Sequence, residues 1–265
     1  GFSRYFRNHY IIPMGAAIWS ASESDIDRFP VRFFLRFFNN HGMLSVYDRP
    51  TWWVISGGSA RYVDRILEPL GNNVYRGTPV TGIERDADGV TLTSHRGAER
   101  YDQVVIATHS DQALAMLADP TSDEQRILGA LPYQDNDVVL HTDSSLMPRN
   151  RRAWAAWNYH IPRDPSEAVS VTYNMNILQN FRDAPETFCV TLNRSHAIDP
   201  DRIIKRFRYA HPGFTLAGME AQSDYERIGG RHRTHYCGAY WFNGFHEDGV
   251  QSALRVARSL GVEWQ

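Results

Sequence analysis

The stretch HYCGAYWFNGFHEDGVQSALRVARSLG, residues 235–261, decides how the rest of the chain is interpreted. The apolar run 235–240 predicts a strand, and it leads into glycine-rich sequence. An acidic pair and a glycine, residues 247–249, come next. The positions after them have the spacing of an amphipathic helix. The stretch therefore predicts a strand, a glycine-rich turn and a helix that begins on acidic residues.

The backbone of such a turn offers a binding site for negative charge. Unpaired N–H groups and the positive end of the helix dipole meet where the helix begins, near His246. Gly238, Gly244 and Gly249 would let a ligand approach the backbone closely. The alternative is a terminal helix with nothing bound, in which the acidic pair only complements the dipole. The predicted buried stripe of the helix comprises Val250, Ala253, Leu254, Ala257 and Leu260.

Composition places the chain among ordinary globular proteins. Its 265 residues are 42% hydrophobic and 22% charged, which suits one large or two modest domains. A net charge of -2 gives no basic excess for nucleic acid or an anionic membrane. Cys189 and Cys237 match neither a metal spacing nor a disulfide framework, so we expect no metal and a cytoplasmic location. No apolar run approaches the ~18 residues of a membrane span.

Aromatic residues mark the first fifth of the chain. Ser22 or Ser24 has the character of a helix N-cap. Five phenylalanines then recur at helical spacing and form either a core-facing stripe or the wall of an apolar substrate pocket. After an extended segment at 52–55, a Gly-Gly turn and Ser59 predict a second helix with its own apolar stripe. The phenylalanines are Phe29, Phe33, Phe34, Phe37 and Phe38.

The centre of the chain contains strand-like runs of two kinds. Short alternating runs broken by ADG (87–89) and HRGAE (95–99) predict a β-meander, followed by a buried strand at 103–107 and helices from Ser110 and over 122–131. Beyond these, the runs at 135–142, 152–160, 168–176 and 187–194 predict an antiparallel sheet of about four strands. The segment DPDRIIKRFRYAHP (199–212) predicts a helix.

Three stretches together resemble one family of flavoproteins. YCGAYWFNGFHEDGVQSA (236–253) is similar to the second flavin-binding segment of the FAD-dependent amine oxidase, phytoene desaturase and protoporphyrinogen oxidase superfamily. ISGGSARYVDRILEPLG (55–71) resembles its Gly-Gly helix, and the segment 74–108 resembles its adenine-side meander. A bacterial subgroup of predicted NAD/FAD-binding proteins has phrases much like VVIATHSDQALAML (104–117). The resemblance covers nearly the whole chain.

The resemblance implies FAD as cofactor and a set of residues near it. In the family, the residue matching Val80 contacts adenine through its backbone, and the strand ending at Thr108 passes near the cofactor. A glycine matching Gly238 meets the pyrophosphate region, and the following turn opens a helix toward the isoalloxazine ring. The implied cofactor-binding residues are Val80, Thr108, Gly238, Trp241, Gly244, His246, Glu247, Asp248, Gly249 and Val250.

The implied fold is mixed α/β, with part of an FAD-binding domain interleaved with a substrate domain of antiparallel sheet and helices. We expect a helical part of the substrate domain at 1–50 and an FAD-domain portion at 51–112. The substrate sheet and its helices would occupy 113–234. The strand and helix at 235–265 would return to the FAD domain.

One device of such flavoproteins is not found in this sequence. The Gly-x-Gly-x-x-Gly strand, turn and helix that binds ADP is absent, and SGGSA (56–60) lacks the required spacing. With its abrupt first residues, the chain is expected to be a piece of a longer flavoprotein whose Rossmann segment lies upstream. This chain alone would then bind FAD weakly or not at all and be inactive.

Individual side chains leave the chemistry open, and no catalytic residue is assigned. Trp241 either stacks by the flavin or belongs to the core, and His246 either contacts the flavin edge or is structural. His109 either lies near the cofactor or belongs to a surface loop, and the alternation at 157–160 either lines the site with one face or reflects sheet packing. The sequence HRTHYC (232–237) lacks the partners of a zinc site.

The expected activity is oxidation or desaturation of an organic substrate by hydride transfer to flavin. The richness in Phe and Trp favours an apolar small molecule as the substrate. The alternative is a non-catalytic module that binds an apolar ligand and never holds flavin.

Overall fold

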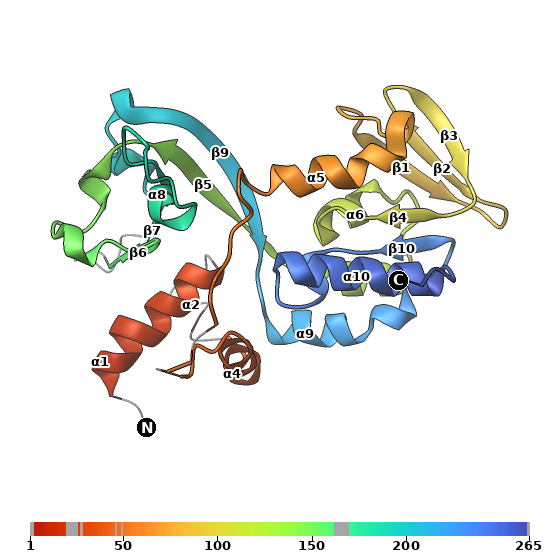
Figure 1. The fold of residues 1–265 in the computed structure, drawn as a ribbon. Helices are drawn as coiled ribbons and strands as arrows, with labels where there is room; N and C mark the ends of the chain where they lie inside the picture. The colour runs from red at the N-terminus through yellow and green to blue at the C-terminus, as the bar shows by residue number, and fades with distance from the viewer. Residues whose placement is uncertain are drawn as a thin grey trace. The chain divides into compact units, whose positions relative to one another are not determined.

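The structure, a computed structural model, describes residues 3–19, 26, 29–45, 47–48, 50–161 and 170–263. The chain forms two compact units, each assembled from two separate stretches (Figure 1). Unit 1 comprises Gly1–Gly71 and Gln134–His211, and unit 2 comprises Asn72–Tyr133 and Pro212–Gln265. The fold is mixed α/β, as the sequence predicts, and the two units interleave along the chain.

Unit 1 is built on a five-stranded sheet with the order β6-β7-β8-β5-β9. The pairs β6–β7, β7–β8 and β8–β5 are antiparallel, which confirms the predicted antiparallel sheet. The four runs predicted from the sequence all contribute a strand, and β9 adds a fifth. The strands are β5 (Tyr133–His141), β6 (Trp157–His160), β7 (Ser170–Asn174), β8 (Cys189–Leu192) and β9 (Ile203–Pro212).

The predicted helix at 199–212 is wrong. The chain makes one 3₁₀ turn, η6 (Pro200–Arg202), and then extends into β9 at the edge of the sheet. Asp199, which suggested a helix N-cap, caps only this turn by accepting from the N–H of Asp201 at 3.1 Å. The isoleucines and aromatic residues of β9 suit a pleated surface, and the exposed Lys and Arg residues of this strand suit the edge of a sheet. Neighbouring sheet edges therefore outweighed the local helical signal.

The helices of unit 1 confirm the core interpretation of the phenylalanine stripe. Phe33, Phe34, Phe37 and Phe38 are all buried in α4, and the Trp19 ring lies 4.8 Å from that of Phe37. Ser22 and Ser24 lie outside the described residues, and α4 begins after Pro30. The helical segments are α1 (Arg4–Phe6), η1 (Arg7–Ile11), α2 (Ile12–Trp19), α4 (Val31–Asn40), α5 (Ala60–Leu67), η2 (Glu68–Asn73) and α8 (Met175–Leu178); the short 3₁₀ turns are η3 (Ser144–Leu146), η4 (Arg151–Ala153) and η5 (Ser195–Ala197).

Helix α5 follows the Gly-Gly turn as predicted, but none of its residues is buried. The apolar positions Tyr62, Val63 and Ile66 face solvent within the described part of the chain. Trp53, in the segment before the helix, is 86% exposed. The residues of this segment and of α5 are therefore not part of the core of unit 1.

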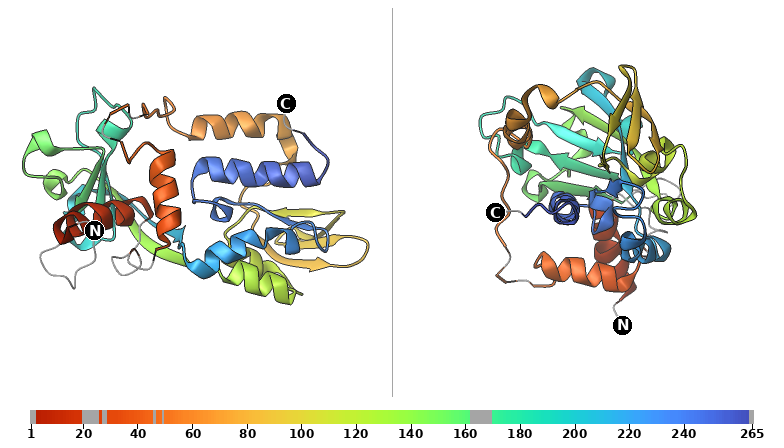
Figure 2. Two further views of the ribbon diagram at one scale, coloured as in Figure 1. Left: turned by 90° about the horizontal axis from the view of Figure 1, so that it is seen from below. Right: turned by 90° about the vertical axis from the view of Figure 1, so that its right-hand side faces the viewer.

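Unit 2 combines a meander, a parallel strand pair and helices, and Figure 2 shows the meander as a sheet of its own. β1, β2 and β3 pair antiparallel in order, which confirms the predicted meander, and Asp86 closes its first turn by accepting from the N–H of Gly89 at 3.0 Å. The elements are β1 (Val80–Arg85), β2 (Val90–Ser94), β3 (Gly97–Tyr101), β4 (Val104–Ile106), α6 (Ser110–Met116), α7 (Ser122–Gly129), α9 (Leu216–Ser223), η7 (Tyr225–Arg227), β10 (Thr234–Tyr236), η8 (Ala239–Trp241) and α10 (His246–Ser259).

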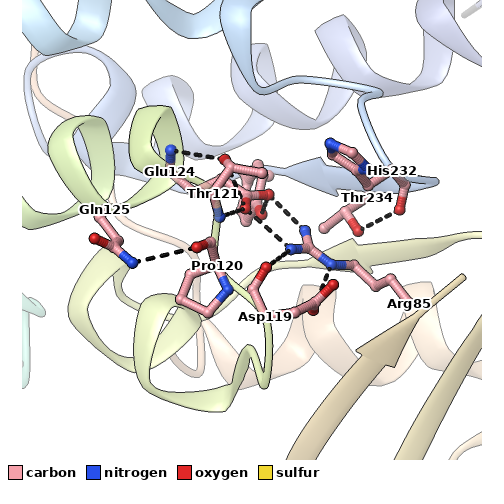
Figure 3. Close-up of polar contacts among 9 residues, drawn as sticks. Arg85, Asp119, Pro120, Thr121, Glu124, Gln125, His232 and Thr234 are labelled. Atoms are coloured by element: carbon pink, nitrogen blue, oxygen red, sulfur yellow. Dashed lines mark hydrogen bonds and ion pairs between the residues drawn. The ribbon is translucent and has the colours of Figure 1, made fainter.

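A buried ion pair joins the meander, α7 and β10 in the core of unit 2 (Figure 3). The Arg85 guanidinium donates to both carboxylate oxygens of Glu124, at 2.5 and 3.0 Å. The Tyr236 hydroxyl donates to the same carboxylate at 2.6 Å, and the Thr121 N–H donates at 2.8 Å. The side chains of Arg85 and Glu124 are 2% and 1% exposed. This network fixes β10, whose end leads into the glycine-rich turn.

The Glu124 carboxylate gives unit 2 a pH dependence. Burial alone would raise the pKa of this carboxyl, but hydrogen bonds from Arg85, Tyr236 and Thr121 outweigh burial and lower the pKa to about 2. A carboxyl with a depressed pKa stabilises the fold fully above its ordinary value of 4.5 and loses that contribution as the pH falls toward 2.

We therefore expect the free energy of unfolding to fall between about pH 4.5 and 2 more steeply in the native chain than in Glu124→Gln. Urea denaturation at a series of pH values measures both slopes. Equal slopes for the two proteins would contradict the assignment of this pH dependence to Glu124.

The compact units and the predicted domains share the interleaved order but have different boundaries. Residues 51–71, predicted with the FAD domain, group with unit 1. Residues 113–133 and 212–234, predicted with the substrate domain, group with unit 2. Compactness does not show which residues contact a cofactor or a substrate, so the predicted domain roles stay a prediction.

Candidate functional site

The candidate site lies in unit 2, where two parallel strands end side by side. β10 pairs parallel with β4, and Tyr236 lies opposite Ile106. The Cys237 N–H then donates to the Ile106 carbonyl at 3.0 Å, so the strands leave the sheet together. Thr108 and Gly238 consequently follow the same carboxyl edge. In open α/β sheets, ligands bind outside this edge.

The turn after β10 is held by a glutamine from α9. The Gln222 amide donates to the Tyr240 carbonyl at 2.8 Å and to the Phe242 carbonyl at 2.7 Å. Gly244 has a φ of +92°, a conformation that L side chains rarely adopt. An added Cβ there would also lie 3.1 Å from the Phe214 ring. Gln222 therefore holds the turn through two backbone carbonyls, and position 244 of the turn requires glycine.

Helix α10 begins without a polar N-cap side chain. Its N-cap residue is Phe245, whose ring has no acceptor for the first-turn N–H groups. Asp248 accepts from the Phe245 N–H at 2.9 Å, so this carboxylate stabilises the chain entering the helix. Glu247 is exposed and accepts from Gln251 at 2.7 Å. The acidic pair thus has structural contacts of its own, while in the described part of the chain the N-cap side chain makes no hydrogen bond to the first-turn N–H groups.

Gly249 leaves open space in the first turn of α10. A Cβ built on this residue would meet no described atom within 4 Å. Gly238 is different, because a Cβ there would lie 2.4 Å from the Tyr240 ring. Gly238 is therefore required by packing, whereas nothing in the described chain explains glycine at 249.

The buried stripe of α10 is not the predicted one. Val250, Ala253 and Leu260 are exposed, and the fully buried positions are Ser252 and Val256. Ser252 bonds to Gly238 beyond β10, and Ser259 contacts His235 within it. Contacts with the end of β10 therefore set the orientation of the helix. Ser252 is buried although the predicted apolar stripe did not include position 252.

Trp241 is part of the core in this structure. It is 2% exposed, and its ring packs edge-on against Tyr225 with centroids 4.9 Å apart. The Tyr240 hydroxyl and the Trp241 indole N–H are both buried and have no hydrogen-bond partner among the described residues. Burial raises the pKa of the Tyr240 hydroxyl. Buried polar atoms of this kind are usually satisfied by water or by a ligand.

All ten predicted cofactor-binding residues lie in unit 2. Val80 begins β1 and packs partly buried against the core of the unit. Thr108 is exposed after β4, and the other eight lie in the turn and the start of α10. Sequence reasoning missed Gln222 and Ser252, because one lies on a separate helix and the other interrupts an apolar stripe.

Other residues considered from the sequence have structural contacts. His109 stacks on Tyr133 at 4.2 Å between ring centroids, and burial raises the pKa of the Tyr133 hydroxyl to about 12. Trp157 packs against Tyr173 in the unit 1 sheet, and Cys237 is buried. Among the described residues, no group of His, Cys, Asp and Glu could hold a metal ion. None of the helices described is long and apolar enough to cross a membrane.

Residues 16–173 match the family described as flavin containing amine oxidoreductase. This match covers more than half of the chain. The chain belongs to this family. The match ends before the second stretch of unit 2, so α10 and the turn preceding it lie outside it. No curated protein sequence matches the chain.

Several solved structures share the fold of this chain. A CLA-producing fatty acid isomerase from P. acnes is similar over 97% of this chain and 63% of its own, with 15% identity and a TM-score of 0.68. Cyclohexylamine oxidase from Brevibacterium oxydans is similar over 98% of this chain and 66% of its own, with 15% identity and a TM-score of 0.61. A putrescine oxidase is similar over 77% of this chain and 53% of its own, with 12% identity and a TM-score of 0.55. The chain thus spans less than two thirds of each of these proteins.

Proposed function

We propose that this chain forms part of an FAD-dependent oxidoreductase and that the carboxyl edge of β4 and β10, with the start of α10, forms part of its flavin site. The observation that carries the proposal is the first turn of α10. It combines uncapped N–H groups with a glycine whose side-chain position is open. Membership of a flavin-containing family supports the same conclusion.

The residues present fit a flavin in three respects. A helix N-terminus favours an acceptor atom or negative charge on a ligand. The open position at Gly249 allows a flat ring to approach the backbone. The buried polar atoms of Tyr240 and Trp241 lack partners in the described chain, and a bound polar group or water would supply them.

Within such a site, the residues of this chain would bind and orient rather than react. Bound FAD supplies the two-electron acceptor for substrate oxidation. The N–H groups of residues 246–248 would stabilise negative charge at the cofactor. Gly238, with Thr108 at the same edge, would allow close backbone contact. Val80 would make its backbone contact with adenine, as the family resemblance implies.

Helix α4 gives no support to an apolar substrate. The four buried phenylalanines of α4 belong to the core, so they do not argue for an apolar substrate pocket. We keep an apolar organic substrate as the proposal because two compared proteins are named for a fatty acid and for a cyclic hydrocarbon amine. A third compared protein is named for putrescine, which is a more polar amine. Comparing flavin reduction by apolar and by simple amine substrates decides between them.

We also propose that an ADP-binding strand, turn and helix from outside this chain completes the flavin site. β4 and β10 form a parallel sheet of only two strands among the described residues. Val105 of β4 is 44% exposed. Parallel sheets are normally covered on both faces and extend over more strands. A Gly-x-Gly-x-x-Gly unit encoded directly upstream would support this proposal, and an unrelated upstream domain would contradict it.

The test of the flavin site is a titration of the chain with FAD, alone and extended by the upstream segment. Bound flavin is measured by its visible absorbance and by extraction. We expect binding by the extended protein and weaker binding by the short chain. If neither protein binds FAD, the flavin site is contradicted, and the chain is better explained as a binding module for an apolar ligand.

Gly249→Ala tests the open position directly. In the flavin-free protein, alanine should stabilise α10 by about 0.5–1 kcal/mol, because glycine inside a helix is unfavourable and the added Cβ meets no neighbour. In the extended protein, the same methyl group should weaken FAD binding by about tenfold. Thermal unfolding and FAD titration measure the two effects. A stabilised variant with unchanged FAD affinity would contradict the role of Gly249.

A further inference from the structure

Ser252 connects two of the glycines assigned to the flavin site. Its hydroxyl accepts from the Gly238 N–H at 2.8 Å and donates to the Gly249 carbonyl at 2.7 Å. The residue is 1% exposed and lies on the face of α10 that is turned to β10. One buried side chain therefore joins the end of β10 to the first turn of α10.

These two bonds have a specific mechanical consequence. The Gly238 N–H follows β10 directly, and Gly249 lies in the first turn of the helix. Both have the hydroxyl of Ser252 as their common partner. Without it, the half-buried Gly238 N–H would lose its partner, and the helix start would no longer be fixed to the strand.

Ser259 provides a natural comparison on the same helix. It lies seven residues further along and therefore on the same face. Its hydroxyl donates to the Val256 carbonyl at 2.7 Å, as that of Ser252 donates to Gly249. Its second contact is with the His235 ring in β10, at 3.3 Å. The two serines thus make similar bonds, Ser252 from a buried position in the middle of α10 and Ser259 from an exposed position at its last residue.

We propose that Ser252 is a positioning residue for the cofactor: it holds the first turn of α10 against the carboxyl end of β10, so that Gly238 and the helix N–H groups meet the flavin in one fixed arrangement. This inference rests on the proposed flavin site. Ser252 need not touch the flavin, because it acts through Gly238 and Gly249. Ser259 stabilises the other end of the helix and has no such role.

The experiment compares Ser252→Ala, Ser252→Thr and Ser259→Ala in the protein extended upstream. FAD titration gives the affinity, and the visible band at saturating FAD reports the flavin environment. Ser252→Ala should weaken FAD binding by about tenfold or more and change the band, because the half-buried Gly238 N–H loses its partner and the helix start is no longer fixed. Ser259→Ala should change the affinity by under about twofold. Ser252→Thr, which keeps the hydroxyl, should restore most of the affinity.

Equal losses of affinity in the two alanine variants would overturn the proposal, because the loss would then not depend on the bond between Ser252 and Gly238. Amide hydrogen exchange of the flavin-free short chain separates this failure from that of the flavin site. Faster exchange at Gly238 in Ser252→Ala, but not in Ser259→Ala, would support positioning by Ser252 even if no FAD is bound. Unchanged exchange at Gly238 would overturn it.

Discussion

Replacing Arg85 with methionine should lower the free energy of unfolding of unit 2 by about 3–5 kcal/mol, because it leaves a buried carboxylate without its ionic partner. The substitution removes two hydrogen bonds to Glu124, two hydrogen bonds to Asp119, and the positive charge that faces the Glu124 carboxylate. The carboxylate would then be buried without its ionic partner, although Tyr236 and Thr121 would still donate to it. Methionine keeps most of the buried stem, so the loss reports the charge rather than a cavity.

Arg100→Met is the matched control in the same meander. Arg100 pairs with Asp86 at 2.7 Å, but the two side chains are about half exposed, so solvent screens the pair and its loss should cost far less stability than the loss of Arg85. Urea denaturation gives both values, and hydrogen exchange at β1 and β10 localises the loss. Similar losses in the two variants would contradict the assignment of Arg85 and Glu124 as the pair that fixes β10.

Replacing Trp241 with alanine should cost about 3–5 kcal/mol in the flavin-free protein. The ring is almost fully buried and packs against Tyr225 and Tyr240, so its removal leaves a cavity in the core of unit 2. This outcome separates the two roles that the sequence left open. A tryptophan that only flanked a flavin would cost little stability before the flavin binds.

Trp53→Ala controls for the loss of a tryptophan as such, because this ring is exposed and should contribute about 0.5 kcal/mol or less. Thermal and urea unfolding of both variants, without added FAD, gives the comparison. If Trp241→Ala unfolds like the native protein and loses only flavin affinity, the core assignment is wrong. Trp241 would then belong to the wall of the cofactor site.

The sequence alone determined the elements whose signals are local. Turn residues at 87–89 and 95–99 defined the meander, and strand-like runs defined four of the five strands of the unit 1 sheet. Glycines and acidic residues placed the start of α10 within a residue or two. Each depends on backbone preferences and short-range hydrogen bonds, so the amino-acid order suffices. The family resemblance was likewise contained in short phrases such as YCGAYWFNGFHEDGVQSA.

Only the tertiary structure decided which residues hold these elements together. β9 became a strand because a neighbouring sheet edge could pair with it, against a local helical signal. Glu124 and Arg85 are far apart in sequence and carry no local sign of burial, yet they meet in the core of unit 2. Ser252 has no apolar character, and its importance appears only when the end of β10 lies beside it. Long-range pairing of polar groups has no sequence period, and for that reason the side chains that position the candidate site could be found only in the folded chain.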